Sequence, residues 1–170
     1  MSIACKILKT VVVATMLIAL PWMANAYEPS TQMYGDEGDQ GKEPWVFDIR
    51  TLTKENENYR DTRWTGEFFQ MVLMSLEPGE GIDLEVHNNH DQFFRVESGT
   101  ARILMGETED HLDFEAKATS GYGIMIPAGY WHKVENAGAD ALKLYTFYAP
   151  PEHLADTVHQ RYEDTEGYEH

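Results

Sequence analysis

The stretches GEGIDLEVHNNHDQFFRVESG (residues 79–99) and GYGIMIPAGYWHKVEN (residues 121–136) carry the most distinctive chemistry of this 170-residue chain. Glu85 and His87 lie two positions apart, and residues at that spacing in a strand point to the same face. Gln92 follows a predicted turn at residues 88–89, and His132 follows a Pro-x-Gly turn that opens another strand. If these strands are neighbours in the fold, the four side chains converge on one point.

Such a set of donors predicts a site for one divalent metal ion. Imidazole nitrogens with carboxylate and amide oxygens suit Zn, Mn, Fe, Ni or Cu. His90 provides an alternative ligand, in a His-x-x-His arrangement with His87. The competing interpretation is that these are ordinary polar positions in a barrel that has lost its metal. An unpaired carboxylate buried in a barrel costs several kcal/mol, however, and a cation at that point removes the penalty.

Both stretches carry a family resemblance. The second fits G-x5-P-x-G-x2-H-x3-N at every fixed position, and the first fits the spacing of G-x5-H-x-H-x4-E-x6-G. Glu85 stands where that motif has its first histidine, and Gln92 where it has its glutamate. On these motifs the chain resembles the cupins, in particular single-domain bacterial cupins labelled mannose-6-phosphate-isomerase-like, over residues 46–159. The resemblance implies an all-β cupin jelly-roll barrel (a β-sandwich), metal ligands at Glu85, His87, Gln92 and His132, and a homodimer.

The rest of the chain predicts the same class of fold. Short apolar or alternating runs separated by turn residues, with little helical periodicity, are typical of a barrel or jelly roll. Residues 97–99 predict a hairpin, residues 53–63 have room for one helical turn at most, and residues 106–120 predict a surface insertion or a lid, of which we favour the insertion. The expected strands are 45–49, 68–76, 82–87, 93–96, 100–105, 122–126, 131–135 and 141–148.

Residues 1–26 have the pattern of a secretory signal peptide. Lys6 and Lys9 precede an apolar run that is too short to cross about 30 Å of hydrocarbon, and a small-residue cleavage site ends at Ala26. We therefore expect a periplasmic or secreted protein with no membrane attachment after cleavage. Cys5, the single cysteine, leaves with the signal, so no thiolate ligand remains. A protein exported before folding takes up its metal outside the cytoplasm, where ferrous iron is less readily held, so Zn or Mn is favoured.

The two flanks of the predicted cupin domain (residues 45–150) are polar. Residues 27–44 predict a flexible acidic lead-in, with an arm on a partner subunit as the alternative. Residues 151–170 predict a tail that wraps the barrel, with its histidines in solvent or, alternatively, as outer metal contacts; these are His153, His159 and His170. The net charge of −16 argues against nucleic acid and anionic membrane as partners.

A ligand pocket is expected beside the metal. Its candidate wall comprises Gln70, Phe94, Trp131 and Tyr145 or Tyr148, and the strand register decides which of these face inward. His90 and Glu97 are candidates for moving a proton. Two functions remain open: a metal-dependent isomerase or dioxygenase acting on a small sugar-like or keto-acid-like substrate, and a non-catalytic barrel that binds a sugar. The few cations near the motifs argue against phosphorylated sugars.

Overall fold

The structure of the chain is a computed structural model that describes residues 38–167. Two antiparallel sheets form most of it, with one short α-helix and one 3-10 helix in the described part. No helix among these residues is long and apolar enough to cross a membrane. The elements are α1 (Ile49–Glu55), β1 (Arg60–Thr65), β2 (Gln70–Leu76), β3 (Gly81–Val86), β4 (Asp91–Ser98), β5 (Thr100–Gly106), β6 (Phe114–Thr119), β7 (Gly123–Ile126), β8 (Trp131–Asn136), β9 (Leu142–Ala149), β10 (Val158–His159) and η1 (Tyr162–Thr165).

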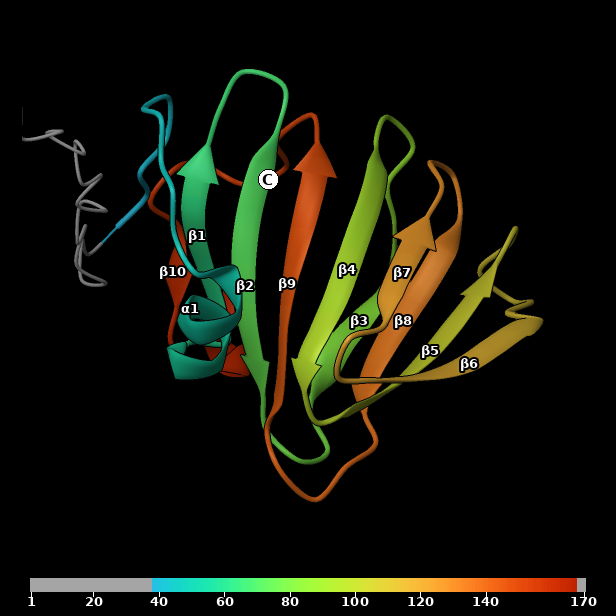
Figure 1. The fold of residues 1–170 in the computed structure, drawn as a ribbon. Helices are drawn as coiled ribbons and strands as arrows, with labels where there is room; N and C mark the ends of the chain where they lie inside the picture. Colours follow the sequence, from blue (N-terminus) through green and yellow to red (C-terminus); the bar gives the residue numbers. More distant parts are fainter. Residues whose placement is uncertain (1–37, 168–170) are drawn as a thin grey trace, which may run out of the picture. The chain divides into compact units, whose positions relative to one another are not determined.

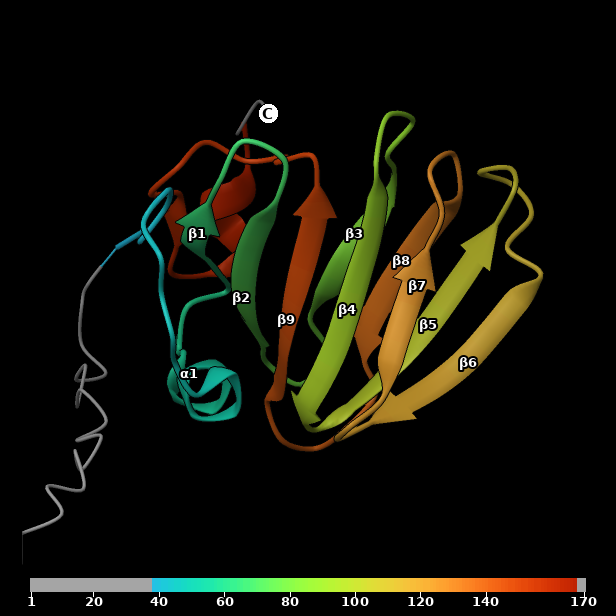
Figure 2. The ribbon, with the colours of Figure 1, turned by 45° about the horizontal axis from the view of Figure 1, so that its top comes forward.

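The strand order confirms the predicted jelly roll. One sheet has six strands in the order β10-β1-β2-β9-β4-β7, and the other has four in the order β3-β8-β5-β6. Figure 1 shows the first sheet spread from β10 to β7, with β3 and β8 behind β4 and β7. The turned view in Figure 2 shows that the chain crosses from one sheet to the other between β4 and β5 and again between β7 and β8. The strands thus build a two-layer sandwich.

The core lies between the two sheets because alternate residues of each strand point inward. In β8, His132, Val134 and Asn136 are buried, whereas the residues between them are partly exposed. In β4, Phe94 and Val96 are completely buried, and they join one cluster with residues of both sheets. We call the opposite side of the six-stranded sheet its outer face.

The strand predicted at residues 45–49 is wrong. The segment before Ile49 is irregular, and Ile49–Glu55 forms the helix α1, of which only residues 53–55 lie in the segment expected to hold one helical turn at most. The Asp48 carboxylate accepts hydrogen bonds from the backbone N–H groups of Arg50 and Thr51, at 3.0 and 3.1 Å. An aspartate that satisfies the first free N–H groups in this way starts a helix.

The predicted hairpin at residues 97–99 is also wrong. Both edges of β4 are already paired, with β7 and β9, so β5 cannot pair with it and joins the other sheet. Gly99 makes this crossing with φ of 87°, and a Cβ atom there would lie 2.9 Å from the Leu142 Cα. The turn is therefore a corner between sheets, and only glycine fits it.

The predicted insertion at residues 106–120 contains the edge strand β6. It pairs with β5 from Thr100↔Thr119 to Met105↔Phe114, so β5 and β6 form a hairpin of this fold. Arg102 Nε lies 2.7 Å from Glu115 Oε1 across the pair. Charged residues on an edge strand discourage pairing with other chains, and they also hide the strand from an apolar-pattern search.

The described parts of the two flanks make specific contacts with the barrel. In the described part of the lead-in, the Asp39 carboxylate accepts from the backbone N–H groups of Gly41 and Thr65, at 2.7 and 2.8 Å. After β9, the chain passes behind the ends of β2 and β1 and adds β10 beside β1 (Figures 1 and 2). His153 and His159 are buried in this segment, so the expectation that they lie in solvent is wrong. The signal-peptide prediction, residues 27–37 and His170 fall outside the described residues.

The outer face carries a continuous row of apolar side chains. Cross-strand pairs connect five strands, and we call their residues the outer apolar row: Trp64, Met71, Phe147, Phe93 and Met125. Beside the row, a groove of about 280 Å³ is lined in part by Trp45, Phe47 and Phe69. At the far end, on the edge strand β7, the Met125 side chain is 73% exposed.

Candidate metal centre

A bulge in β3 turns Glu85 towards the interior. Ile82 pairs with Val134, and Glu85 pairs with His132. Two residues of β3 but only one residue of β8 lie between these pairs, so β3 contains one extra residue. An extra residue of this kind reverses which side chains face inward, and bulges are common beside functional sites. As a result Ile82 packs in the core, and Glu85 lies next to the inward-facing His132.

The Pro-x-Gly turn of the second stretch is bonded to the first stretch. The Gly129 N–H donates to the His87 carbonyl at 2.8 Å, and the Ala128 N–H donates to the Asp91 carboxylate at 2.9 Å. Gly129 has φ of 82°, a conformation that favours glycine. These bonds fix the strand that starts at Trp131 beside the loop that carries His87.

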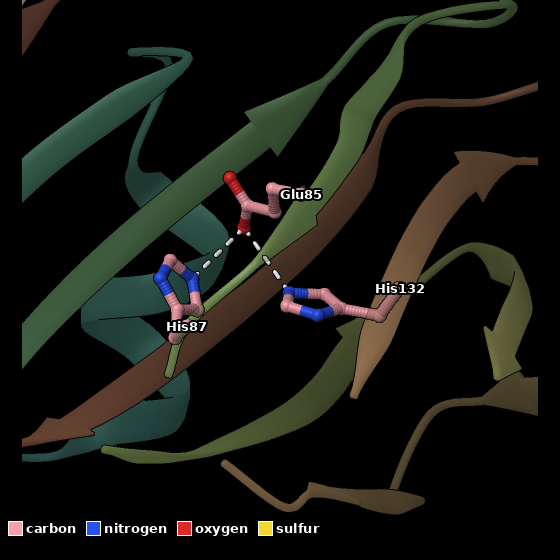
Figure 3. A group of neighbouring side chains, drawn as sticks. All are labelled: Glu85, His87 and His132. Atoms are coloured by element: carbon pink, nitrogen blue, oxygen red, sulfur yellow. Dashed lines mark hydrogen bonds and ion pairs between the residues drawn. The ribbon is translucent and has the colours of Figure 1, made fainter. Parts of the chain in front are cut away.

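Three donor atoms converge on one point, as predicted for Glu85, His87 and His132. Figure 3 shows both imidazole rings pointing at the same carboxylate oxygen. Glu85 Oε1 lies 3.3 Å from His87 Nε2 and 3.2 Å from His132 Nε2. The Glu85 side chain is 28% exposed, and His132 is completely buried, so the cluster is open on the glutamate side.

The hydrogen-bond partner of His132 defines its tautomer. His132 Nδ1 lies 3.1 Å from the Tyr130 carbonyl oxygen, which only accepts, so Nδ1 carries the hydrogen. In a neutral ring Nε2 then has a bare lone pair, and that lone pair faces the carboxylate oxygen. Two electron-pair donors face each other stably only when the ring is protonated or a cation lies between them. The arrangement is compatible with a metal site.

Glu85 is ionised in this environment. Burial raises the pKa of its carboxyl group, but the contacts with His132 and His87, which donate to it when their rings are protonated, outweigh burial and hold the pKa well below its usual range. The cluster therefore presents a formal negative charge to any cation that enters.

Gln92, the predicted fourth ligand, faces the barrel interior from β4. Its side chain is buried on β4, and Nε2 donates to Thr146 Oγ1 at 3.2 Å. Its Oε1 atom is buried without a hydrogen-bond partner. A buried carbonyl oxygen without a partner is costly, and this one is free to coordinate.

The sequence interpretation missed Glu152, which follows β9. Its two carboxylate oxygens lie 3.6 Å from His87 Nδ1 and 3.5 Å from His90 Nδ1. The His87 and His90 rings stack with centroids 4.4 Å apart, so His90 lies beside the cluster. Burial, followed by the charge of His87, lowers the pKa of His90. No motif marks Glu152, because the fold alone brings it here.

Gln70 is not a pocket residue. Its Oε1 accepts from the backbone N–H groups of Glu152 and His153, at 3.2 and 2.9 Å. Its Nε2 donates to the His153 carbonyl and to Thr65 Oγ1, at 2.8 and 2.9 Å. Both oxygen lone pairs and both amide hydrogens are used, so nothing is left for a ligand.

Two of the remaining predicted wall residues face the wrong way. Tyr145 lies on the outer face, with its ring 5.4 Å from Phe147. Trp131 shares the outward side of β8 with Lys133 and Glu135. Phe94 does point inward, but it is completely buried in the core. Tyr148 is the inward aromatic residue, with its ring 5.7 Å from His87 and 5.6 Å from His90.

Glu97 is too far from the cluster to move a proton there. It lies five residues beyond Gln92 on β4, which is about 16 Å in a strand. Its carboxylate lies 3.3 Å from Arg95 Nε, and Arg95 alternates with the inward-facing Phe94 and Val96. Glu97 therefore forms an ion pair outside the barrel interior.

Comparisons with known proteins support the same architecture. A family model described as "Cupin domain" matches residues 72–148. The crystal structure of BH2720 from Bacillus halodurans is 46% identical, with a TM-score of 0.72, and the match covers 72% of this chain and 93% of that one.

Two curated proteins also match. The uncharacterized protein YrkC of Bacillus subtilis is 48% identical over 122 residues, which are 72% of this chain and 66% of YrkC. The chain thus spans about two thirds of that relative's length. Mannose-1-phosphate guanylyltransferase 2 of Escherichia coli O157:H7 is 32% identical over 79 residues, which are 46% of this chain and 15% of that protein.

Proposed function

Because the chain belongs to the cupin domain family, we propose that Glu85, His87 and His132 hold one divalent metal ion, with Gln92 as a fourth ligand. One observation carries the proposal: two imidazole Nε2 atoms point at the same carboxylate oxygen, and the Nδ1 hydrogen of His132 is already given to a carbonyl. A cation at this point turns an unfavourable contact between lone pairs into coordination.

The spacing of the donor atoms suits a metal. Tetrahedral ligands about 2.1 Å from a metal lie about 3.4 Å from each other. The nitrogen–oxygen distances of 3.2 and 3.3 Å are close to that value. We favour Zn or Mn, as above, with Fe, Ni or Cu as competitors, since two imidazoles and a carboxylate suit all of them.

We propose that the site takes a small polar ligand of the sugar or keto-acid type. A metal in this position supplies Lewis-acid polarisation of a ligand oxygen. The exposed side of Glu85 gives the ligand access, and Tyr148 forms an aromatic wall beside His87. The similarity to a mannose-phosphate enzyme supports a sugar, although it covers only 15% of that protein.

An isomerase or dioxygenase reaction needs a group that moves protons or orients the substrate, and His90 is the candidate in this site. Its Nε2 is buried without a hydrogen-bond partner, and the lowered pKa keeps the ring neutral at neutral pH. A neutral imidazole accepts a proton from a ligand held beside it. The alternative is a non-catalytic sugar-binding barrel; in that case His90→Gln retains ligand binding, and no turnover is found in the parent.

Metal analysis tests the proposal. We expect the purified mature protein to hold close to one metal ion per chain, and His132→Ala to lose it. His111→Ala is the matched control, because His111 is exposed and lies outside the cluster. Elemental analysis after loading with Zn or Mn, and then with the competing metals, gives the answer. A parent protein that takes up none of Zn, Mn, Fe, Ni and Cu overturns the proposal, and one that takes up only Fe, Ni or Cu corrects the choice of metal. The mass of the same mature protein tests the predicted export, since cleavage after Ala26 leaves Tyr27 as the first residue.

A further inference from the structure

We infer that Glu152 is a positioning residue of the metal centre: its carboxylate keeps the hydrogen of the His87 ring on Nδ1 and so directs the bare Nε2 at the metal. The inference rests on the proposed metal site and goes beyond it, because Glu152 belongs to neither histidine stretch. The contact is between Glu152 Oε1 and His87 Nδ1, at 3.6 Å.

The Nδ1 atoms of His132 and His87 face different hydrogen-bond acceptors. A neutral imidazole has one hydrogen, and it coordinates a metal through Nε2 only when that hydrogen is on Nδ1. His132 gives its Nδ1 hydrogen to the backbone carbonyl of Tyr130 at 3.1 Å. For His87, the acceptor beside Nδ1 is the Glu152 carboxylate.

The chemistry of the contact fixes its direction. A carboxylate only accepts, so its negative charge favours the tautomer with hydrogen on the near nitrogen. At 3.6 Å the contact is longer than a hydrogen bond, and its effect is therefore mainly electrostatic. The Glu152 side chain is only 17% exposed, which limits screening by water. Carboxylate–histidine–metal arrangements of this kind tune metal affinity in other proteins.

The same carboxylate also holds the neighbouring ring. Glu152 Oε2 lies 3.5 Å from His90 Nδ1, and the His87 and His90 rings are stacked. Asn89 Oδ1 lies closer to the same His90 nitrogen, at 3.0 Å. Glu152 thus bridges the two rings, and it shares His90 with Asn89. The orientation of His87 is therefore set by both its own partner and its neighbour's.

Gln70 holds the backbone that carries Glu152. Its amide bonds the N–H of Glu152, the N–H of His153 and the carbonyl of His153, at 3.2, 2.9 and 2.8 Å. Three hydrogen bonds to one buried side chain hold the backbone of Glu152 and His153 in place, and so fix the point from which the Glu152 side chain extends. A chain of contacts thus runs from Gln70 through Glu152 to His87.

Zinc affinity is the first readout. We expect Glu152→Ala to raise the zinc dissociation constant about 10–100-fold, the usual effect of removing such a partner. Glu152→Gln keeps an oxygen acceptor of the same shape, so it should restore part of the affinity. Glu163→Ala removes an exposed negative charge from the same C-terminal segment and should bind zinc like the parent.

The ring tautomer of His87 in the metal-free protein is the second readout. In the metal-free protein Glu85 Oε1, 3.3 Å from His87 Nε2, competes with Glu152 for the hydrogen. Nitrogen NMR at about pH 8, where an ordinary imidazole is neutral, should therefore find hydrogen on both nitrogens in the parent. It should find more hydrogen on Nε2 in Glu152→Ala, with Glu152→Gln in between. A His87→Asn variant assigns the signal. A purely structural role for Glu152 leaves this ratio unchanged.

The outcomes separate the two proposals. A tautomer ratio and zinc affinity that both stay within twofold of the parent in Glu152→Ala overturn the role of Glu152. A parent that binds no metal, together with the tautomer shift, overturns the metal proposal but supports Glu152 as the residue that positions His87. If Glu152→Ala does not fold, the comparison of parent, Glu152→Gln and Glu163→Ala decides.

Discussion

The two faces of the six-stranded sheet are made by the same strands but carry different kinds of side chains. On β9, Leu144, Thr146 and Tyr148 point inward to the core and the metal cluster. Tyr145 and Phe147 point outward and pack with other aromatic rings. The inner face combines close packing with converging polar groups, and the outer face carries an apolar row and the covering helix α1, whose end accepts a hydrogen bond from Lys143.

Each face also carries a carboxylate that is at least partly buried, and the two have opposite pKa shifts. On the inner face, burial raises the pKa of Glu85, but the contacts with His132 and His87 outweigh burial and lower it. On the outer face, Asp61 lies opposite Leu73, and burial outweighs Arg63 and raises its pKa. A buried carboxylate that stays charged beside two imidazoles is arranged for a cation, whereas one pushed towards its neutral form is a structural cost.

Two adjacent phenylalanines of β4 give the sharpest test of the comparison. Phe94 is completely buried on the inner face, so Phe94→Ala should lower the free energy of unfolding by about 3–5 kcal/mol. Phe93 lies on the outer face with its ring 6.3 Å from Phe147, and Phe93→Ala should cost only about 0.5–1.5 kcal/mol. Urea unfolding of both variants measures the difference. Equal losses would mean that the outer face is covered as completely as the core.

We expect the outer apolar row to form the contact between two copies of the chain. The homodimer expected from the sequence remains a proposal, and this row suits it, because a two-fold contact places the same patch on both copies. Met125 is 73% exposed at the end of the row, so Met125→Lys should weaken dimerisation at least about tenfold, or about 1.4 kcal/mol. Sedimentation measures the dissociation constant, with Lys117→Met on β6 as a control away from the row. A parent that stays monomeric rules out the dimer.

The motif spacing was sufficient to find the cluster. Spacing and the family motif together predict Glu85, His87 and His132, because each lies at a fixed place in a strand or turn, and Gln92, predicted with them, stays a prediction. Apolar and alternating runs predict most strands, but they miss β1, β6 and β10, whose residues are largely polar or charged, and the Asp48 cap replaces a predicted strand by α1. An aspartate before Ile49 and Leu52 is a helix-start signal that could have been read.

The sequence does not predict which face of a sheet each side chain points to, nor the contacts between residues far apart in the chain. Tyr145 and Tyr148 are both aromatic residues of β9, but they lie an odd number of residues apart and so face opposite sides. Bulges at Asp83–Leu84 and at Glu97 shift the register without any sequence mark. Glu152 and Gln70 meet through the chain that follows β9, and no local pattern records that contact.

The pH dependence of stability tests the second carboxylate. Asp61 Oδ1 is buried without a hydrogen-bond partner, and its pKa is raised above the ordinary 3.8. Between the ordinary value and the raised one, the native state holds more protons than the unfolded state, so stability falls as pH rises through that window. Asp61→Asn cannot ionise and lacks this loss. The parent should therefore lose stability relative to Asp61→Asn as pH rises from about 3 to about 7.

Urea unfolding at several pH values measures this difference, and Glu109→Gln, at an exposed position, should give a curve parallel to that of the parent. A difference between the parent and Asp61→Asn that stays constant would show that Asp61 has the same pKa in both states. A difference that grows in favour of the parent would show that Arg63, 3.4 Å from Asp61, outweighs burial. Asp61 would then resemble Glu85, and the two faces would differ only in what their buried charges attract.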